Sequence, residues 1–183
     1  MALTIDDIEH IYTQRGHEQY AGEPVTMLAH ALQSAHLAEQ EGAGDELVVA
    51  ALLHDLGHLL HDMAGTPSAD GIDDVHQYRV VPFFRGLFSE SVINAVQLHV
   101  DAKRYLCAVD TSYHGALSAD SQRSLQLQGG IYTPEQAQAF IAQPGAQDAV
   151  RLRRWDDQAK QAGRPTPDLP HFLQHVRRCA LSS

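Results

Sequence analysis

The chain has 183 residues and a formal net charge of -10, with 13 Lys and Arg against 23 Asp and Glu. This length fits one domain with a proper hydrophobic core. The acidic balance argues against a nucleic-acid surface or docking on anionic lipid, because both need basic patches. The 12 histidines nearly equal Lys plus Arg in number, so metal ligation is the first explanation to test.

Most of the chain is predicted to be helical. The expected helices run from a capping pair at Thr4 and Asp7 to Arg15, then over about 25–41, from a cap at Asp45 past Leu59, 75–87 with a break at Pro82, 90–106, 118–128, 134–143, 146–162 and, after a Pro-rich loop, to about 180. A loop is expected over 62–74. No alternating run predicts a strand. The fold class is therefore a single all-α domain, a bundle of eight or nine helices over residues 1–183, and such bundles place metal sites in the core.

Other features exclude some settings. No apolar run approaches the ~20 residues of a membrane helix, so no membrane partner is expected. The N-terminal residues Met-Ala-Leu-Thr-Ile-Asp-Asp lack the pattern of a secretory signal. Cys107 and Cys179 cannot form a disulfide framework and are read as structural thiols. Together these features predict a cytoplasmic protein.

The motif His54-Asp55-Leu56-Gly57-His58 is the first sign of a site. On a continuous helix, His54 and His58 share one face and Asp55 projects beside His54. Leucines on both sides predict a buried setting, where imidazole and carboxylate groups are costly unless paired or ligated. Taken alone, the dipeptide fits a buried ion pair as well as a metal site.

Further residues shift the balance towards metal. His30, His76 and His99 fall on other predicted helices, and Asp156 lies beside Asp157 near the end of the chain. This ordered series of four histidines and two aspartates resembles the HD-domain superfamily over residues 20–157. Imidazole and carboxylate ligands suit iron, manganese or zinc without choosing among them. Most HD proteins are phosphohydrolases, and a minority bind two irons and activate oxygen.

The flanking motifs resemble that minority. They are Tyr20-Ala21-Gly22-Glu23, the run from His99 to Leu106 with Lys103 one turn after His99, Ser118-Ala119-Asp120-Ser121 followed by Leu127-Gln128-Gly129-Gly130, and Arg153-Arg154-Trp155-Asp156. With the histidine series they resemble the mixed-valent di-iron oxygenases that cleave the carbon–phosphorus bond of 1-hydroxyphosphonates. The resemblance implies two iron ions, Fe(II) and Fe(III), with O2 as co-substrate. The implied substrate is a small organophosphonate, 2-amino-1-hydroxyethylphosphonate or its N-trimethyl analogue, converted to phosphate plus glycine or glycine betaine.

The resemblance also implies a role for each residue. One iron would be held by His30, His54, Asp55 and Asp156, and Asp55 would bridge to a second iron completed by His76 and His99. Tyr20 would contact the second iron until substrate arrives, and His58 would lie beside the substrate as a catalytic and binding residue. The phosphonate would be bound by Lys103, Ser121, Gln128 and Arg153, and the ammonium group by Glu23.

Several alternatives remain open at this point. An HD phosphohydrolase would use two divalent metals to activate water, and a non-catalytic HD-like sensor would only bind its ligand. Asp157 could replace Asp156, and neither the amine substituent nor the oligomeric state is predicted. The remaining histidines are interpreted as surface or capping residues, with His61 also considered for the cavity: His10, His17, His36, His61, His114, His171 and His175.

Overall fold

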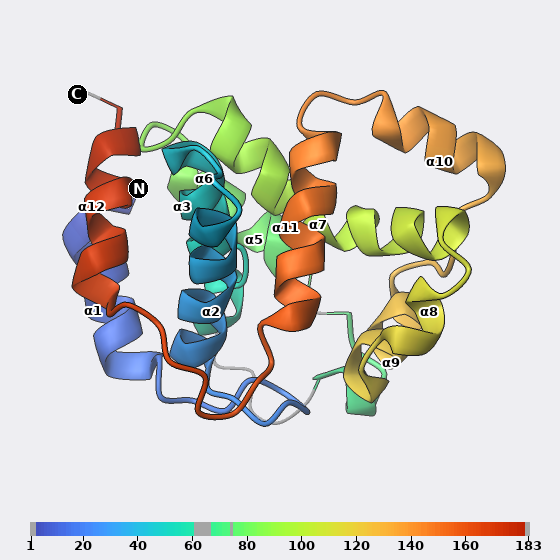
Figure 1. Cartoon of the computed structure of the whole chain (residues 1–183), viewed down its shortest axis with the longest axis horizontal. Coiled ribbons are helices and arrows are strands. Elements are labelled where there is room, and N and C mark those ends of the chain that lie inside the picture. The colour runs from blue at the N-terminus through green and yellow to red at the C-terminus, as the bar shows by residue number, and fades with distance from the viewer. Residues whose placement is uncertain (1–2, 61–66, 74, 182–183) are drawn as a thin grey trace.

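Helix α3 (Asp45–Leu53) lies at the centre of the fold, because every residue from Leu47 to Leu53 is buried. A helix that is apolar on all sides needs partners on all sides. The computed structural model, which describes residues 3–60, 67–73 and 75–181, supplies them. Figure 1 shows α3 between α12 (Leu169–Cys179) and α11 (Ala146–Gln158), with α2 (Met27–Gln40) packed along it.

The predicted all-α class is confirmed. The remaining helices are α1 (Ile5–Arg15), α4 (Leu56–Leu59), the short 3-10 helix η1 (Pro67–Asp70), α5 (His76–Arg79), α6 (Val81–Phe84), α7 (Glu90–Val109), α8 (Tyr113–Ala116), α9 (Ala119–Leu127) and α10 (Pro134–Ile141). The described part of the chain holds no strand, only isolated bridges that join Gln19 to Thr26 and Arg85 to Phe88.

Most of the helix caps indicated by the sequence are present, but the cap predicted at Asp45 is wrong, because Gly44 is the N-cap of α3 and Asp45 is the first residue of the helix. Thr4 and Asp7 form the expected capping box at the start of α1, and Thr133 caps α10 with Pro134 at its first position. Ser118 accepts a hydrogen bond from the backbone of Ser121 at the start of α9. These pairs are local in sequence, so tertiary packing does not override them.

The helix expected over 75–87 breaks near Pro82 as predicted: it forms two short helices that meet at Val80, with Pro82 in the first turn of α6.

Two other helix predictions differ from the structure. The helix expected from Asp45 past Leu59 is interrupted at His54 and Asp55, where Asp55 has φ -102° and ψ 7°. The expected helix over 146–162 ends at Gln158, and the one-turn helix α8 was not predicted. The interruption at Asp55 lies in the histidine cluster described below, whose tertiary contacts outweigh helical periodicity.

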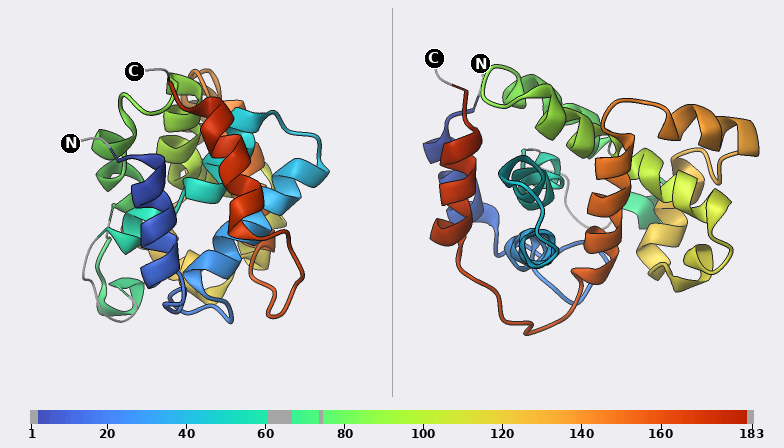
Figure 2. Two further views of the ribbon diagram at one scale, coloured as in Figure 1. Left: turned by 90° about the vertical axis from the view of Figure 1, so that its left-hand side faces the viewer. Right: turned by 45° about the horizontal axis from the view of Figure 1, so that its top comes forward.

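The core is divided by position along α7. A large cluster packs α1, α2, α3 and α12 against the first half of α7 and the end of α11. Two smaller clusters form around the second half of α7, one with α8 and α9 and one with α10. The right-hand view of Figure 2 shows α8, α9 and α10, in yellow to orange, to one side of the main bundle. The candidate site lies where these clusters meet.

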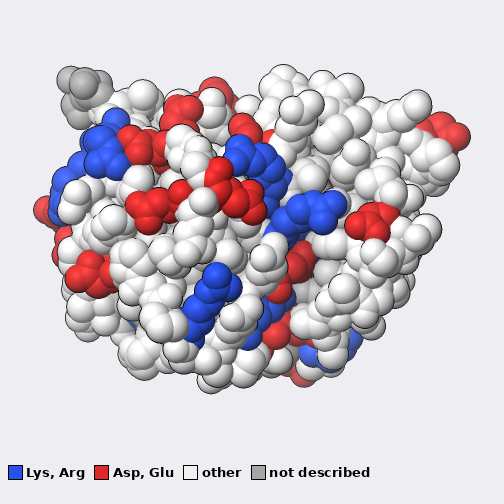
Figure 3. All heavy atoms as spheres, viewed as in Figure 1, with Lys and Arg blue, Asp and Glu red and all other residues white. Residues whose placement is uncertain are grey.

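The surface carries both signs of charge. Figure 3 shows one face of the molecule, on which acidic and basic side chains are interspersed instead of forming one broad basic area. No helix within the described ranges is both long enough and apolar enough to cross a bilayer.

Candidate metal centre and adjoining pocket

The six predicted metal ligands come together in two groups that share Asp55. The first group is His30, His54, Asp55 and Asp156, and the second is Asp55, His76 and His99; within each group the nearest ligand atoms all lie within 4.8 Å of one another. All six residues are buried. They come from α2, the turn between α3 and α4, α5, α7 and α11, so five separate segments must pack correctly to assemble the cluster.

The first group is spaced as ligands of one ion. His30 Nε2 lies 3.2 Å from His54 Nε2, 3.4 Å from Asp55 Oδ2 and 3.4 Å from Asp156 Oδ1. Metal–ligand bonds of about 2.1 Å put neighbouring donors about 3.0 to 3.4 Å apart, depending on coordination geometry. The observed separations therefore fit a single cation between the donors.

Asp55 connects the two groups through its two oxygens. Its Oδ2 lies 3.4 Å from both His30 Nε2 and His54 Nε2. Its Oδ1 lies 3.1 Å from His76 Nε2 and 3.5 Å from His99 Nε2, and those two nitrogens are 3.2 Å apart. One carboxylate thus faces two cation-sized sites, which is the geometry of a bridging ligand.

The imidazole rings are held with Nε2 towards the cluster. His30 Nδ1 lies 2.9 Å from the Ala159 carbonyl oxygen, and His54 Nδ1 lies 2.8 Å from that of Ala51. His99 Nδ1 makes the same contact with Val96, at 2.6 Å. Each carbonyl can only accept, so Nδ1 is the protonated nitrogen and Nε2 offers its lone pair, as in metal-ligating histidines.

Two buried oxygens also point to a cation. Asp55 Oδ2 and Asp156 Oδ1 have no hydrogen-bond partner although both are buried. Burial would raise the pKa of Asp55, but the surrounding His54, His30 and His76 hold it well below its usual range. Burial lowers the pKa of His30, yet Asp156 and Asp55 outweigh this and raise it to about 9. Positive charge is therefore strongly favoured between these groups, and the donor set fits a pair of transition-metal ions.

The glycine of the motif has a packing reason. A Cβ built on Gly57 would lie 2.3 Å from the His76 carbonyl oxygen and 2.9 Å from its carbonyl carbon. The turn after Asp55 therefore packs directly on the backbone of α5. Only glycine permits this approach, and the approach sets the position of His76.

Tyr20 and His58 lie on the open side of the cluster. The Tyr20 ring stacks on His30, with centroids 4.1 Å apart, and the His58 ring stacks on His76 at 3.9 Å. His58 Nε2 is 3.7 Å from Asp55 Oδ1. Burial and the charges of Asp55 and Asp156 raise the pKa of Tyr20 well above its ordinary value. Both rings line the same pocket, where sequence analysis expected the substrate.

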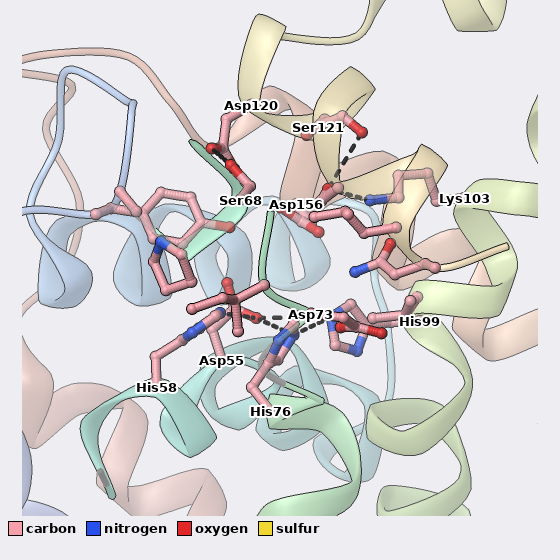
Figure 4. A pocket seen from close by; sticks show the side chains of 18 of the residues that line it. Asp55, His58, Ser68, Asp73, His76, His99, Lys103, Asp120, Ser121 and Asp156 are labelled. Carbon is pink, nitrogen blue, oxygen red and sulfur yellow. Dashed lines mark hydrogen bonds and ion pairs between the residues drawn. The ribbon is translucent and has the colours of Figure 1, made fainter. Parts of the chain in front are cut away.

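The predicted phosphonate-binding residues lie on the wall opposite His58 and His76. Figure 4 shows Lys103 and Ser121 across the pocket from Asp55 and these two rings. Lys103, Ser121, Gln128 and Arg153 all line it. The Oε1 atom of Gln128 is buried without a hydrogen-bond partner.

Arg153 separates the two neighbouring aspartates. Its Nη1 lies 2.8 Å from Asp156 Oδ2, and its other nitrogens bond Asp157. Asp157 also accepts a hydrogen bond from Tyr113 and belongs to neither ligand group. Burial would lower the pKa of Arg153, but the two aspartates raise it well above its usual value. The geometry thus places Asp156 with the histidines and Asp157 behind the arginine.

Two residues near this wall were missed by the sequence analysis: Ser124 lines the pocket, and Lys160 contacts Ser121 from behind it. Lys103 Nζ donates to Ser124 Oγ at 2.6 Å, and Lys160 Nζ lies 3.1 Å from Ser121 Oγ. Lys160 also pairs with Glu23 at 3.0 Å. Neither residue stands in a recognisable motif, and Lys160 lies just beyond the end of α11, so only the three-dimensional structure reveals them.

Glu23 occupies a different place from the other predicted site residues. It is buried and pairs with Lys160, and it accepts a hydrogen bond from Ser118. It does not line the pocket, whereas two other carboxylates, Asp73 and Asp120, do. His61 lies outside the described residues.

An all-helical fold with a buried His-Asp cluster defines a metal-dependent helical protein of the HD type. The chain belongs to the HD-domain family, which it matches over residues 27–139.

Individual relatives narrow the group. The chain is 38% identical over 174 residues to (1-hydroxy-2-(trimethylamino)ethyl)phosphonate dioxygenase (glycine-betaine-forming) of Leisingera caerulea, covering 95% of this chain and 89% of the relative. It is 42% identical over 167 residues to hydroxymethylphosphonate dioxygenase of Gimesia maris, covering 88% and 81%. An uncharacterized protein of Acanthamoeba polyphaga mimivirus is 29% identical over 171 residues, covering 92% and 78%. The first two relatives, together with the family match, confirm the resemblance to HD-domain phosphonate oxygenases.

Proposed function

We propose that the protein is an oxygenase that uses O2 and two iron ions, Fe(II) and Fe(III), to cleave the carbon–phosphorus bond of a 1-hydroxyphosphonate. The reaction converts R–CH(OH)–phosphonate and one O2 into R–carboxylate and phosphate, so C1 is oxidised and O2 is fully reduced. One observation supports this most: the Asp55 carboxylate is shared by two buried donor groups at the floor of a pocket with cationic side chains on its wall.

The proposed ligand sets follow the two groups. His30, His54, Asp55 and Asp156 would hold one iron, and Asp55, His76 and His99 the other. When bound, the irons supply the redox chemistry with O2, for which the chain itself has no cofactor-like group. The chain fixes the ligand nitrogens through the backbone contacts of His30, His54 and His99.

The phosphonate end would be bound by the wall that holds Lys103. Lys103 and Arg153 offer positive charge, while Ser121 and Gln128 offer neutral polar groups. Burial, with the nearby Arg153, lowers the pKa of Lys103 to about 7, and a dianionic ligand would favour its charged form. An acidic protein can thus bind one small dianion without a broad basic surface.

The reacting carbon would then lie near His58 and Tyr20. His58 can hold or donate a proton within the pocket, where its Nε2 lies 3.7 Å from Asp55 Oδ1. The Tyr20 ring stacks on His30 and lines the same pocket, so it stands next to the proposed metal ligands. We assign Tyr20 the part of a neighbour that makes way for O2.

Two candidate substrates differ in the group attached to C1. The relative from Leisingera caerulea favours 1-hydroxy-2-(trimethylamino)ethylphosphonate, with the primary amine as its analogue, and Glu23 would meet the ammonium group after turning from Lys160. Hydroxymethylphosphonate is a second candidate. It is supported by the name of the Gimesia maris relative. The pairing of Glu23 with Lys160 also supports it, because Glu23 then has a cationic partner within the protein and does not need an ammonium group on the substrate.

A direct assay separates the functions. The protein is purified without oxygen, loaded with ferrous iron and given each of the three phosphonates. We expect O2 uptake and phosphate release in equal amounts, and loss of turnover in His99→Ala. Phosphate released without O2 would instead indicate a metal-dependent phosphohydrolase, and substrate binding without turnover would indicate a sensor.

We further propose a single domain over residues 1–183, a cytoplasmic location and no nucleic-acid or membrane partner.

A further inference from the structure

A second group of possible metal ligands lies on the far edge of the molecule. Glu39 on α2 faces His171 and His175 on α12, and Figure 1 places α12 on the opposite side from α8 and α9. His171 and His175 are four residues apart, so their rings project from one face of the helix. Their Nε2 atoms lie 2.8 Å and 3.3 Å from the same oxygen, Glu39 Oε1.

The orientation of His175 suits a metal ligand. Its Nδ1 lies 2.6 Å from Asp45 Oδ1, and its Nε2 lies 3.3 Å from Glu39 Oε1. The ring therefore turns one nitrogen towards Glu39 and the other towards a second carboxylate. A histidine that donates Nδ1–H to a carboxylate and directs Nε2 at other donors is the usual arrangement of a metal ligand with its supporting acid.

Arg178 holds Asp45 in place beside His175. It donates to Asp45 through Nε at 2.7 Å and Nη2 at 3.0 Å, and Nη2 also lies 2.9 Å from His175 Nδ1. The charge of Arg178 is thus paired with Asp45, and the Glu39 carboxylate faces the two imidazole rings.

The distances fit a tetrahedral ion. Zn–N and Zn–O bonds of about 2.0 to 2.1 Å put tetrahedral ligands about 3.3 Å apart. The separation of His175 from Glu39 matches this value at 3.3 Å, and His171, now at 2.8 Å, would move about 0.5 Å away from Glu39 as the ion enters. His36 Nδ1 is buried without a hydrogen-bond partner and lies 3.7 Å from the other oxygen of Glu39. The His171 side chain is 40% exposed, so the site is open to solvent and water can complete the coordination.

We propose that Glu39, His171 and His175 form a second divalent-metal site, for zinc or a similar first-row cation, that joins α12 to α2. Two imidazoles and one carboxylate form a donor set that such ions accept. The site shares no residue with the Asp55 centre, and it does not depend on the proposed oxygenase activity. The ion would link α12 to α2, and so stabilise the packing of α12 against the central helix α3.

The test uses the full chain with its core already loaded with iron. Zinc is titrated by calorimetry, and both metals are counted per chain after desalting. We expect one added zinc per chain with iron content unchanged. His175→Ala and His171→Ala should each weaken zinc binding by more than about 100-fold, because even loss of an outer-shell partner costs about 10- to 100-fold. Asp45→Asn should weaken zinc binding by about 10- to 100-fold, because Asp45 supports His175 without binding the ion itself.

His17→Ala provides the matched control, since His17 is an exposed histidine outside the cluster. It should bind zinc as the unmodified chain does. His171→Ala removes the more exposed ring and so guards against a folding defect in His175→Ala. The proposal is overturned if no zinc is added, if zinc enters only as iron leaves, or if the cluster variants bind zinc as tightly as His17→Ala.

Discussion

Replacing Lys103 by Met should stabilise the protein while abolishing phosphonate binding. Lys103 is 2% exposed and its ammonium has one hydrogen bond, to Ser124. Methionine keeps most of the apolar stem and removes the charge. The buried ammonium lowers the stability of the protein when no phosphonate is bound, and it supplies positive charge when the phosphonate binds. Binding sites are often built in this way, at the expense of stability.

The magnitude can be worked from the pKa. Burial, followed by the charge of Arg153, lowers the pKa of Lys103 from 10.5 to about 7, although Asp156 and Asp157 oppose the shift. At roughly 1.4 kcal/mol per pKa unit, this buried charge costs about 4 kcal/mol of folding free energy at pH 7. The lost hydrogen bond to Ser124 offsets about 1 kcal/mol. The net gain of about 3 kcal/mol corresponds to a rise in Tm of roughly 6 to 12 °C for a chain of this size.

The dependence on pH has a definite sign. Between about pH 7 and 10.5 the unfolded chain keeps the Lys103 proton that the folded chain loses, so the stability of the unmodified protein rises with pH through this window. The advantage of Lys103→Met should therefore be largest below pH 7 and fade towards pH 10.5. Bound metal adds positive charge nearby and does not reverse this order.

Thermal unfolding at several pH values, with phosphate release measured in parallel, tests the reasoning. Arg123→Met is a suitable control because Arg123 is a half-exposed cation paired with Asp120, and such surface pairs contribute at most about 1 kcal/mol. A Lys103→Met protein that melts below the unmodified chain at pH 6, or that retains turnover, would refute the account of Lys103.

Three further results are expected. Gly57→Ala should displace His76, since the added Cβ would lie 2.3 Å from its carbonyl oxygen; elemental analysis should show iron falling from two towards one per chain. Asp55→Asn should lower turnover by at least about 100-fold, because a neutral amide is a poor bridge between two cations; metal binding and rate that match the unmodified enzyme would contradict the bridging role. Glu23→Gln should raise KM for the two ammonium-bearing phosphonates at least about tenfold more than for hydroxymethylphosphonate, and an equal effect on all three would remove Glu23 from substrate recognition.

Local signals made much of the fold predictable. The caps at Thr4, Ser118 and Thr133 satisfy backbone donors within the next few residues, so they act before distant contacts matter. The continuous helix expected through His54 and Asp55 was wrong for the opposite reason. Its break depends on contacts with His30, His76 and His99, which are remote in sequence.

The candidate site was predictable to the extent that motifs mark it. The six proposed ligands could be identified from the ordered series of histidines and aspartates along the chain, and the structure brings these residues together. Lys160 has no such marker, because its place beside Ser121 results from the path of the chain after α11. The pairing of Glu23 with that lysine was equally invisible in the sequence.

The distribution of the six proposed ligands has a consequence for the life of the protein. They are drawn from five segments between α2 and α11, so two bound irons would act as cross-links through the whole bundle. A ligand that binds only the folded chain stabilises it by an amount that grows with the ratio of its concentration to its dissociation constant. The same polypeptide would therefore resist unfolding, and any proteolysis that requires unfolding, better with its metals bound than without them.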